Sequence, residues 1–256
     1  MNQNQIELPA VKGGFWTWAW RFWIDVSFRK TFAALHWNGV EADLAAKMAP
    51  HPGQPTIFAS NHCGWWDGFV ARLVMEKLLG YDGFVPMEAK NLRRFPTMTR
   101  LGAFGLDRDN PRAAMGALKW ASETLTAKER RALWIFSQGE LLPQDTRPLV
   151  IEGGTAWVAE RIGARIVPVA IRYEMRDLPN PEVFISLGEP IQPTGQRRET
   201  TQALETSLGA LVNALRDDVA NDRFDRSRPA IQGGRGVDAW WEGVKAAFGA
   251  PNNEDR

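Results

Sequence analysis

Several residue types are scarce in this chain of 256 residues, and their scarcity excludes several classes of protein. A single cysteine, Cys63, excludes an internal disulfide and is typical of a reducing compartment. The 31 Lys and Arg residues nearly balance the 30 Asp and Glu residues, so the net charge of +1 provides no overall field for nucleic acid. No apolar run reaches the ~18 residues of a membrane span, and the N-terminus lacks the cleavage site of a signal peptide. We therefore expect a cytoplasmic chain with one full hydrophobic core.

Tryptophan, by contrast, is abundant, with 12 copies against two tyrosines. Its side chain favours membrane–water interfaces, because one end of the ring system is apolar and the other can stay wet. Residues 15–37 predict a helix with Trp16, Trp20 and Trp23 toward one side and Arg21 among its positive charges. Such a helix can lie in the headgroup plane of an anionic membrane and hold the protein peripherally on the cytoplasmic face of the cell membrane. The alternative is a helix buried in the core or between subunits.

Strands and helices are predicted to alternate along the rest of the chain. The alternation predicts an α/β fold with a mixed, largely parallel sheet flanked by helices, preceded by the amphipathic Trp-rich N-terminal helical region. The expected division is a membrane-interface segment (1–37), a main domain (38–227) and a C-terminal segment (228–256). In the last segment, a linker up to residue 236 precedes an amphipathic helix with Trp240 and Trp241. The strands are expected at 55–60, within 80–89, and at 132–136, 164–172 and 182–191, and the helices at 66–79, 91–108 (broken at Pro96 and ending in a turn), 111–127, 153–163 and 199–220.

His62 follows directly after the strand predicted at 55–60, at the kind of strand end where open α/β sheets bind ligands. On a continuous helix, His62 and Asp67 would point about 140° apart. The two side chains can meet only if His62 lies in the turn before the helix and Asp67 in its first turn, and Ser60 or Asn61 can initiate that turn. Asp67 would then hold one ring nitrogen of His62 protonated and leave the other as a general base. The alternative is a structural histidine near a surface aspartate.

Four short blocks follow one another in order between residues 57 and 172. They are Asn61-His62-x4-Asp67, then LGAFGLDR with Gly102, Asp107 and Arg108, then FSQGEL at 136–141, then Ile166-Val167-Pro168-Val169. This ordered set resembles the glycerolipid acyltransferases, of the lysophosphatidate acyltransferase type. The blocks of that family read Asn-His-x4-Asp, Gly-x-x-Phe-(Ile/Val)-(Asp)-Arg, Phe-Pro-Glu-Gly-Thr-Arg and a strand with a central Pro. LGAFGLDR matches the second of these with a small shift.

The resemblance implies transfer of a fatty acyl group from acyl-coenzyme A or acyl-carrier protein to a lipid hydroxyl, with no cofactor and no metal. It implies that the segment 38–227 is the acyltransferase domain. His62 would deprotonate the hydroxyl, Asp67 would orient His62, and Arg108 would bind a phosphate or another polar group of the acceptor. The other substrate-binding residues would be Asn61, Gln138, Gly139 and Glu140.

The third block departs from the family pattern, with Gln138 at the position of its Glu and Leu141 at that of its Arg. Glu140 is a candidate to replace the carboxylate, whereas the only cation close in sequence to Leu141 is Arg147. Loss of a cation would weaken phosphate binding by roughly 1.5–3 kcal/mol. The acceptor is therefore either a lysophospholipid such as 1-acylglycerol-3-phosphate or a less charged lipid or glycolipid. A catalytically idle lipid-binding or scaffold protein and a soluble acyl-thioester hydrolase are the other two readings.

Three residues next to His62 have more ordinary interpretations. Cys63 is expected to be packed rather than nucleophilic, because neighbours in a chain rarely present their side chains to each other. Of Trp65 and Trp66, one is expected to line an acyl tunnel and the other to fill the core, because consecutive helix residues diverge by about 100°.

Overall fold

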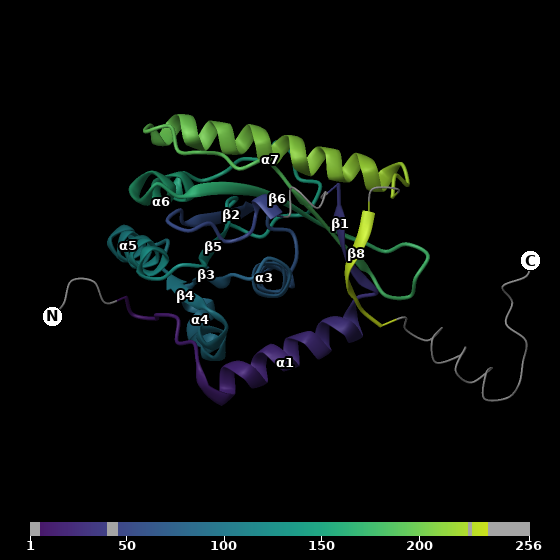
Figure 1. Ribbon diagram of the computed structural model, residues 1–256, viewed down its shortest axis with the longest axis horizontal. Coiled ribbons are helices and arrows are strands. Elements are labelled where there is room, and N and C mark those ends of the chain that lie inside the picture. Colours follow the sequence, from purple (N-terminus) through teal and green to yellow (C-terminus); the bar gives the residue numbers. More distant parts are fainter. Residues whose placement is uncertain (1–5, 40–45, 225–226, 235–256) are drawn as a thin grey trace, which may run out of the picture.

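The computed structural model describes residues 6–39, 46–224 and 227–234 of the chain (Figure 1). Its strands are β1 (Ala34–Asn38), β2 (Thr56–Ser60), β3 (Asp82–Glu88), β4 (Ala103–Leu106), β5 (Arg131–Phe136), β6 (Arg165–Glu174), β7 (Glu182–Leu187) and β8 (Ser227–Gln232). They form one eight-stranded sheet in the order β4-β3-β5-β2-β6-β7-β1-β8. The pairs β6–β7 and β1–β8 are antiparallel and the other five are parallel. The predicted α/β fold with a mixed, mostly parallel sheet is confirmed.

Helices cover both faces of the sheet, with α1 and α7 on opposite sides of it (Figure 1). The helices are α1 (Gly14–Thr31), α3 (Asp67–Arg72), the π-helix η1 (Leu73–Leu78), α4 (Ala89–Arg94), the 3-10 helix η2 (Pro96–Leu101), α5 (Pro111–Ala127), α6 (Gly154–Ile162) and α7 (Arg197–Ala220). Successive side chains of a strand point to opposite faces. On β2, Phe58 accordingly packs with residues of α1, α3 and η1, whereas Ile57 and Ala59 pack with residues of α5, α6 and α7. The sheet thus separates two apolar cores.

The first three blocks contain or directly follow the ends of β2, β4 and β5, and these three strands end at one edge of the sheet. β2 lies between β5 and β6, and its last residue, Ser60, pairs with Phe136 on β5 and Val169 on β6. β4 runs parallel to β3, which runs parallel to β5. Because the carboxyl ends of parallel strands meet at the same edge, the segments after β2, β4 and β5 lie on one side of the sheet.

The helix predicted at 15–37 is wrong over its last residues. α1 ends at Thr31, and Phe32 already has an extended backbone with φ −114° and ψ 146°. Residues 34–38 form β1, because both edges of this segment find hydrogen-bonding partners, β7 on one side and β8 on the other. Leu35 is fully buried there. Its apolar side chain therefore belongs to the core of the sheet and not to a helix face.

The linker predicted at 228–236 is also wrong over residues 228–232, where β8 forms the outer strand beside β1. Pro229 is compatible with this position, because an edge strand does not need every backbone donor. The segment expected as a turn after the break at Pro96 contains β4, and the predicted helix at 66–79 consists of α3 followed by η1. The predicted C-terminal helix lies outside the described residues.

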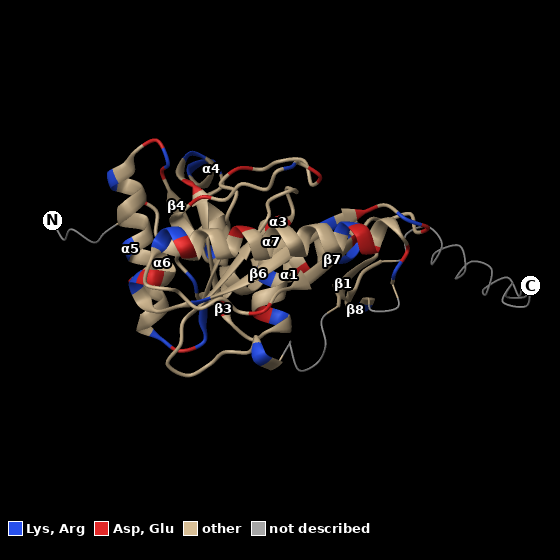
Figure 2. Cartoon of the chain, turned by 90° about the horizontal axis from the view of Figure 1, so that it is seen from above, with Lys and Arg blue, Asp and Glu red and all other residues tan. Residues whose placement is uncertain are grey.

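Ion pairs fasten α1 to the helices that follow β2. The carboxylate of Asp25 lies 2.5 Å from the guanidinium of Arg72 and 2.6 Å from the ammonium of Lys77, and Arg21 lies 2.7 Å from Glu76. Elsewhere, Lys and Arg are mixed with Asp and Glu over the helices and loops (Figure 2). Among the described helices, none combines the length and the apolar character that crossing a membrane requires.

Candidate active site

The turn between β2 and α3 brings His62 and Asp67 together. His62 lies in the turn and Asp67 is the first residue of α3, as their spacing requires, and His62 Nδ1 is 2.7 Å from Asp67 Oδ2. The side chain of Asp67 is 0% exposed and that of His62 is 25% exposed. Within the described part of the chain, no residue bonds to His62 Nε2. The carboxylate is therefore hidden, while the imidazole reaches the surface.

The carboxylate of Asp67 also organises the turn itself. Its Oδ2 accepts hydrogen bonds from the backbone N–H groups of Cys63, at 2.7 Å, and Gly64, at 2.9 Å. Its Oδ1 accepts a hydrogen bond from the hydroxyl of Tyr173, at 2.6 Å. Together with the bond to His62, the buried carboxylate has four partners, which offset the cost of removing its charge from water.

The side chains of Ser60 and Asn61 are bonded to neighbouring strands. Asn61 Nδ2 donates to the carbonyl of Ile171 and Asn61 Oδ1 accepts from the N–H of Ile171, each at 2.9 Å. Ser60 Oγ accepts from Trp134 Nε1 at 2.8 Å. Neither of them caps the helix, since no side chain in the described residues caps the N-terminus of α3. Asn61 instead holds the start of the turn against β6.

The third block positions His62 from the side of β5. The imidazole stacks on the ring of Phe136, with centroids 4.3 Å apart. The backbone N–H of His62 donates to Gln138 Oε1 at 2.9 Å, and its carbonyl accepts from the N–H of Leu142, also at 2.9 Å. Gln138 thus bonds to the backbone of His62 with an uncharged amide.

Arg108 reaches the third block from the segment after β4. Its guanidinium donates to the carbonyl oxygen of Gly139 and to the carboxylate of Glu152. Gly139 has a φ of +77°, and a Cβ added there would lie 2.5 Å from Glu152 Oε1, so this close arrangement requires glycine. Glu140 and Leu141 are both exposed. The carboxylate that faces Arg108 is therefore that of Glu152, not that of Glu140.

Three residues that contact the site were not anticipated from the sequence: Tyr173, Phe136 and Glu152. Tyr173 had no signal in the sequence alone, because its place follows from the pairing of Ser60 with Val169 on β6, four residues before it. A β6 strand longer than β2 must therefore extend over the turn that holds His62. Glu152 had none either, since its approach to Arg108 depends on the path of the loop after β5.

Cys63 lies in the turn and is partly buried. Its Sγ donates to the carbonyl of Ile171, with 3.6 Å between the two atoms. Burial, and then the negative charge of Asp67, raise the pKa of the Cys63 thiol well above its ordinary value. The thiol therefore stays protonated and is a poor nucleophile.

An exposed aromatic surface lies on α1. The helix buries Thr17, Ile24 and Phe28 on one face. The opposite face presents Phe15, Trp16, Trp18, Phe22 and Trp23, each at least 46% exposed. We refer to these five residues as the aromatic face. Among the predicted interface residues, Trp16 and Trp23 belong to it, whereas Trp20 is partly buried and Arg21 is paired with Glu76.

The aromatic face continues toward His62 through ring contacts. Trp23 contacts Phe69 at a centroid distance of 6.5 Å, and Phe69 contacts Trp65 at 5.3 Å. Trp65 is 68% exposed, whereas Trp66 packs against the ring of Phe32 in the core. Trp66 thus packs against the core, as expected for one of the two tryptophans, whereas the side chain of Trp65, three residues after His62 in the sequence, is exposed.

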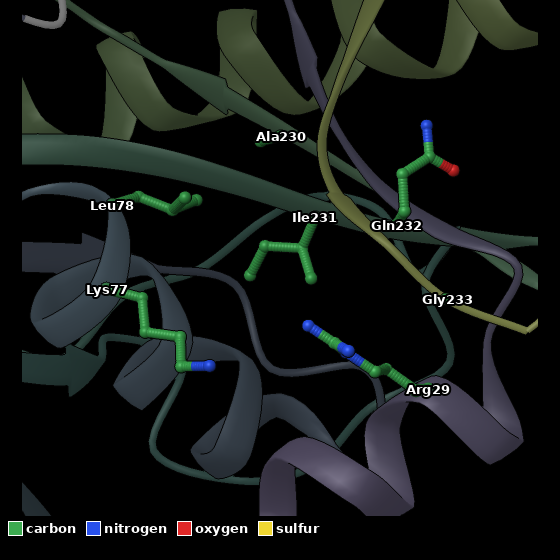
Figure 3. A pocket seen from close by; sticks show the side chains of 7 residues that line it. All are labelled: Arg29, Lys77, Leu78, Ala230, Ile231, Gln232 and Gly233. Atoms are coloured by element: carbon green, nitrogen blue, oxygen red, sulfur yellow. The ribbon is translucent and has the colours of Figure 1, made fainter.

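A surface pocket of about 450 Å³ lies between the C-terminal part of α1, η1 and β8 (Figure 3). Arg29 and Lys77 extend into it from different helices, and Leu78 and Ile231 add apolar surface. Lys77 also pairs with Asp25, at 2.6 Å. None of the residues that line this pocket belongs to the four blocks.

Comparison with known proteins identifies the family of the chain. A family model described as Acyltransferase matches residues 42–172, slightly more than half of the chain. A comparison with curated proteins gives no match. The matched stretch runs from before β2 into β6 and contains His62, Asp67, Arg108 and the third block. The chain belongs to the acyltransferase family.

Proposed function

We propose that this acyltransferase moves a fatty acyl group from a thioester to a lipid hydroxyl, with His62 as the general base. One observation carries the proposal: His62 Nδ1 is bonded to the buried carboxylate of Asp67, while Nε2 is free of bonds to the described residues. Asp67 favours the tautomer with the proton on Nδ1. Nε2 then carries the lone pair that a general base needs.

The reaction is a direct attack by the acceptor on the thioester. His62 Nε2 takes the proton of the acceptor hydroxyl as its oxygen bonds to the thioester carbon. The tetrahedral intermediate then expels the thiolate, the carbon–sulfur bond breaks, and the imidazolium returns its proton to the sulfur. The products are the acylated lipid and the free thiol. The raised pKa of Cys63 keeps that thiol neutral, which disfavours an acyl-cysteine intermediate.

A neutral, hydroxyl-rich acceptor fits the site better than lysophosphatidate does. The cation of Arg108 already faces Glu152, and Leu141 presents an apolar side chain where a second cation would help a phosphate. Arg147 donates to Asn213 on α7 at 2.8 Å, so its guanidinium is engaged elsewhere. A phosphate would have to displace Glu152 or lie beside its charge, which is unfavourable. A hydroxyl can accept from Arg108 and donate to Glu152.

Peripheral attachment to the membrane would bring this acceptor to His62. The support is the aromatic face of α1, together with the exposed Trp65, since apolar aromatic surface of this kind favours the membrane–water interface. The last turn of α1 adds Arg29 and Lys30, which suit anionic headgroups.

The test measures thiol release from palmitoyl-coenzyme A and from palmitoyl acyl-carrier protein. Wild type is compared with His62→Ala and with the control His51→Ala, since the exposed imidazole of His51 bonds, among the described residues, only to the carbonyl of Pro52. Each protein is assayed without acceptor, with lysophosphatidate, and with a neutral glycolipid fraction. We expect release that needs the neutral acceptor, is kept in His51→Ala and falls by about 10²–10⁴-fold in His62→Ala.

The other outcomes separate the alternatives. Release that prefers lysophosphatidate would contradict the proposal of a neutral acceptor. It would mean that the ion pair between Arg108 and Glu152 separates to admit the phosphate. Release without any acceptor that still needs His62 would identify a thioester hydrolase. No release from either donor with any acceptor would favour an idle lipid-binding protein.

A further inference from the structure

We propose that Tyr173 is a positioning residue of the active site, which fixes the carboxylate of Asp67 and thereby sets the pH range in which His62 can act as a base. The catalytic part of this inference rests on the proposed function of His62. The contact itself does not, because it is a property of the folded chain.

Tyr173 supplies the partner of the carboxylate oxygen that His62 does not use. Its hydroxyl donates to Asp67 Oδ1 at 2.6 Å, whereas Oδ2 accepts from His62 and from the N–H groups of Cys63 and Gly64. Across the described ranges, no Lys or Arg bonds to Asp67. The negative charge of this fully buried group is therefore balanced by hydrogen bonds alone, and a charge-assisted bond of this kind is a strong one.

The structure holds Tyr173 in place from three sides. A Cβ added at Gly64 would lie 2.7 Å from Tyr173 Cε2, so the ring occupies space that only glycine leaves free. On another side, the ring of Phe32 lies 5.7 Å from that of Tyr173. Gln144 bonds to both backbone groups of Tyr173: Nε2 donates to its carbonyl and Oε1 accepts from its N–H, each at 3.2 Å.

The phenol of Tyr173 remains a donor across the working pH range. Burial, and then the charge of Asp67, raise the pKa of Tyr173 well above its ordinary value. The other ionisable groups around this cluster are Cys63, whose thiol stays neutral, and Arg172, which is paired with Asp145 at 2.8 Å and with Glu174 at 2.5 Å. None of these groups bonds to Asp67 Oδ1 in place of the hydroxyl.

The position of Tyr173 follows from the length of β6. β2 ends at Ser60, which pairs with Val169, while β6 continues to Glu174 and so passes over the turn that holds His62. Tyr173 lies one residue beyond the matched stretch of 42–172. The family match therefore assigns no role to it.

Removal of the hydroxyl changes the charge that His62 experiences. In Tyr173→Phe, the carboxylate of Asp67 loses one of its donors and attracts the imidazole proton more strongly. Neutral His62 then forms only at higher pH. We expect the acid limb of the pH–rate profile to move to higher pH by about one unit. At pH values where His62 is mostly protonated, the variant should be about tenfold less active than wild type, and at higher pH its activity should recover. A purely structural loss would lower the rate equally at all pH values.

The decisive measurement is the titration of His62 by NMR in the full chain, which needs no turnover. The chain has only three histidines, so His62→Ala identifies the signal. The control is Tyr81→Phe, which removes the hydroxyl of the only other tyrosine; that hydroxyl bonds to Met48, Thr56 and Arg165 and not to Asp67. We expect the midpoint of the His62 titration to rise in Tyr173→Phe and to stay in Tyr81→Phe.

An unchanged midpoint in folded Tyr173→Phe would overturn the proposal, even if activity fell. If that variant does not fold, 3-fluorotyrosine incorporated in the Tyr81→Phe background labels Tyr173 alone. Its more acidic hydroxyl is a stronger donor, so the midpoint must then fall, and a rise or no change would overturn the proposal. A midpoint that moves as expected in a chain with no acyl transfer would reject the proposed function and leave the positioning contact standing.

Discussion

Gly64→Ala tests the packing around the active-site turn with a single added methyl group. The new Cβ would lie 2.7 Å from Tyr173 Cε2 and 3.2 Å from Asp67 Oδ1. The Tyr173 ring cannot easily retreat, because Gln144 holds its backbone and Phe32 lies against it. The φ of Gly64 is not in the left-handed region, so the effect is one of contact and not of backbone strain.

The magnitude follows from the cost of overpacking a well-filled interior, typically about 1–3 kcal/mol. For a chain of this size, ~2 kcal/mol lowers the Tm by about 4–8 °C. Because a small displacement of Asp67 tilts the imidazole of His62, kcat for thiol release should fall by about tenfold or more. The matched control is Gly68→Ala in α3, where no atom beyond the neighbouring residues and the backbone of the helix itself lies within 4 Å of the added Cβ.

Thermal unfolding and thiol release measured on the same preparations give the answer. Gly68→Ala should keep the wild-type rate and gain up to about 1 kcal/mol, because Ala is the better helix former. If Gly64→Ala matches wild type in both Tm and kcat, the turn accommodates the added methyl group without cost. The tight packing of Tyr173 and Asp67 around Gly64 is then refuted.

Two further predictions concern the thiol and the aromatic face. Because its raised pKa keeps Cys63 protonated at pH 8, iodoacetamide should label the native chain far more slowly than the urea-unfolded chain, as followed by mass spectrometry; equal rates would show an accessible thiolate. The double variant Trp18→Glu and Phe22→Glu should lose at least about tenfold in flotation with anionic vesicles, since each aromatic side chain buried in the interface contributes about 1.5–3 kcal/mol. Val150→Glu, at another exposed apolar position, should float like wild type, and equal flotation of all three proteins would place the membrane contact elsewhere.

Local rules explain why much of the fold could be predicted. The helix α5 begins where Asn110 precedes Pro111, and the side chain of Asn110 accepts from the N–H groups of Arg112 and Ala113. α6 ends at Gly163, which has a φ of +63°. The meeting of His62 with Asp67 was predictable for the same reason, since five residues across a strand–turn–helix junction leave one way for the side chains to touch.

Residues whose state depends on distant partners were not predictable in this way. The sequence predicts Leu35 in a helix and Pro229 in a linker, yet Leu35 lies in β1 and Pro229 in β8. These strands form because each completes hydrogen bonds with strands far away in the sequence. Deletion of residues 1–37 would therefore remove most of a strand as well as α1, so point variants are the cleaner test of the aromatic face.

The sequence by itself determined the α/β architecture and the His62–Asp67 pair, because periodicity, capping and short spacing act within a few residues along the chain. The tertiary structure decided the surroundings of that pair. Tyr173 reaches Asp67 only because β6 extends beyond the end of β2 in the sheet. Glu152 reaches Arg108 only because the loop after β5 folds back on itself. These contacts are set by register and loop path, which no local pattern in the sequence encodes.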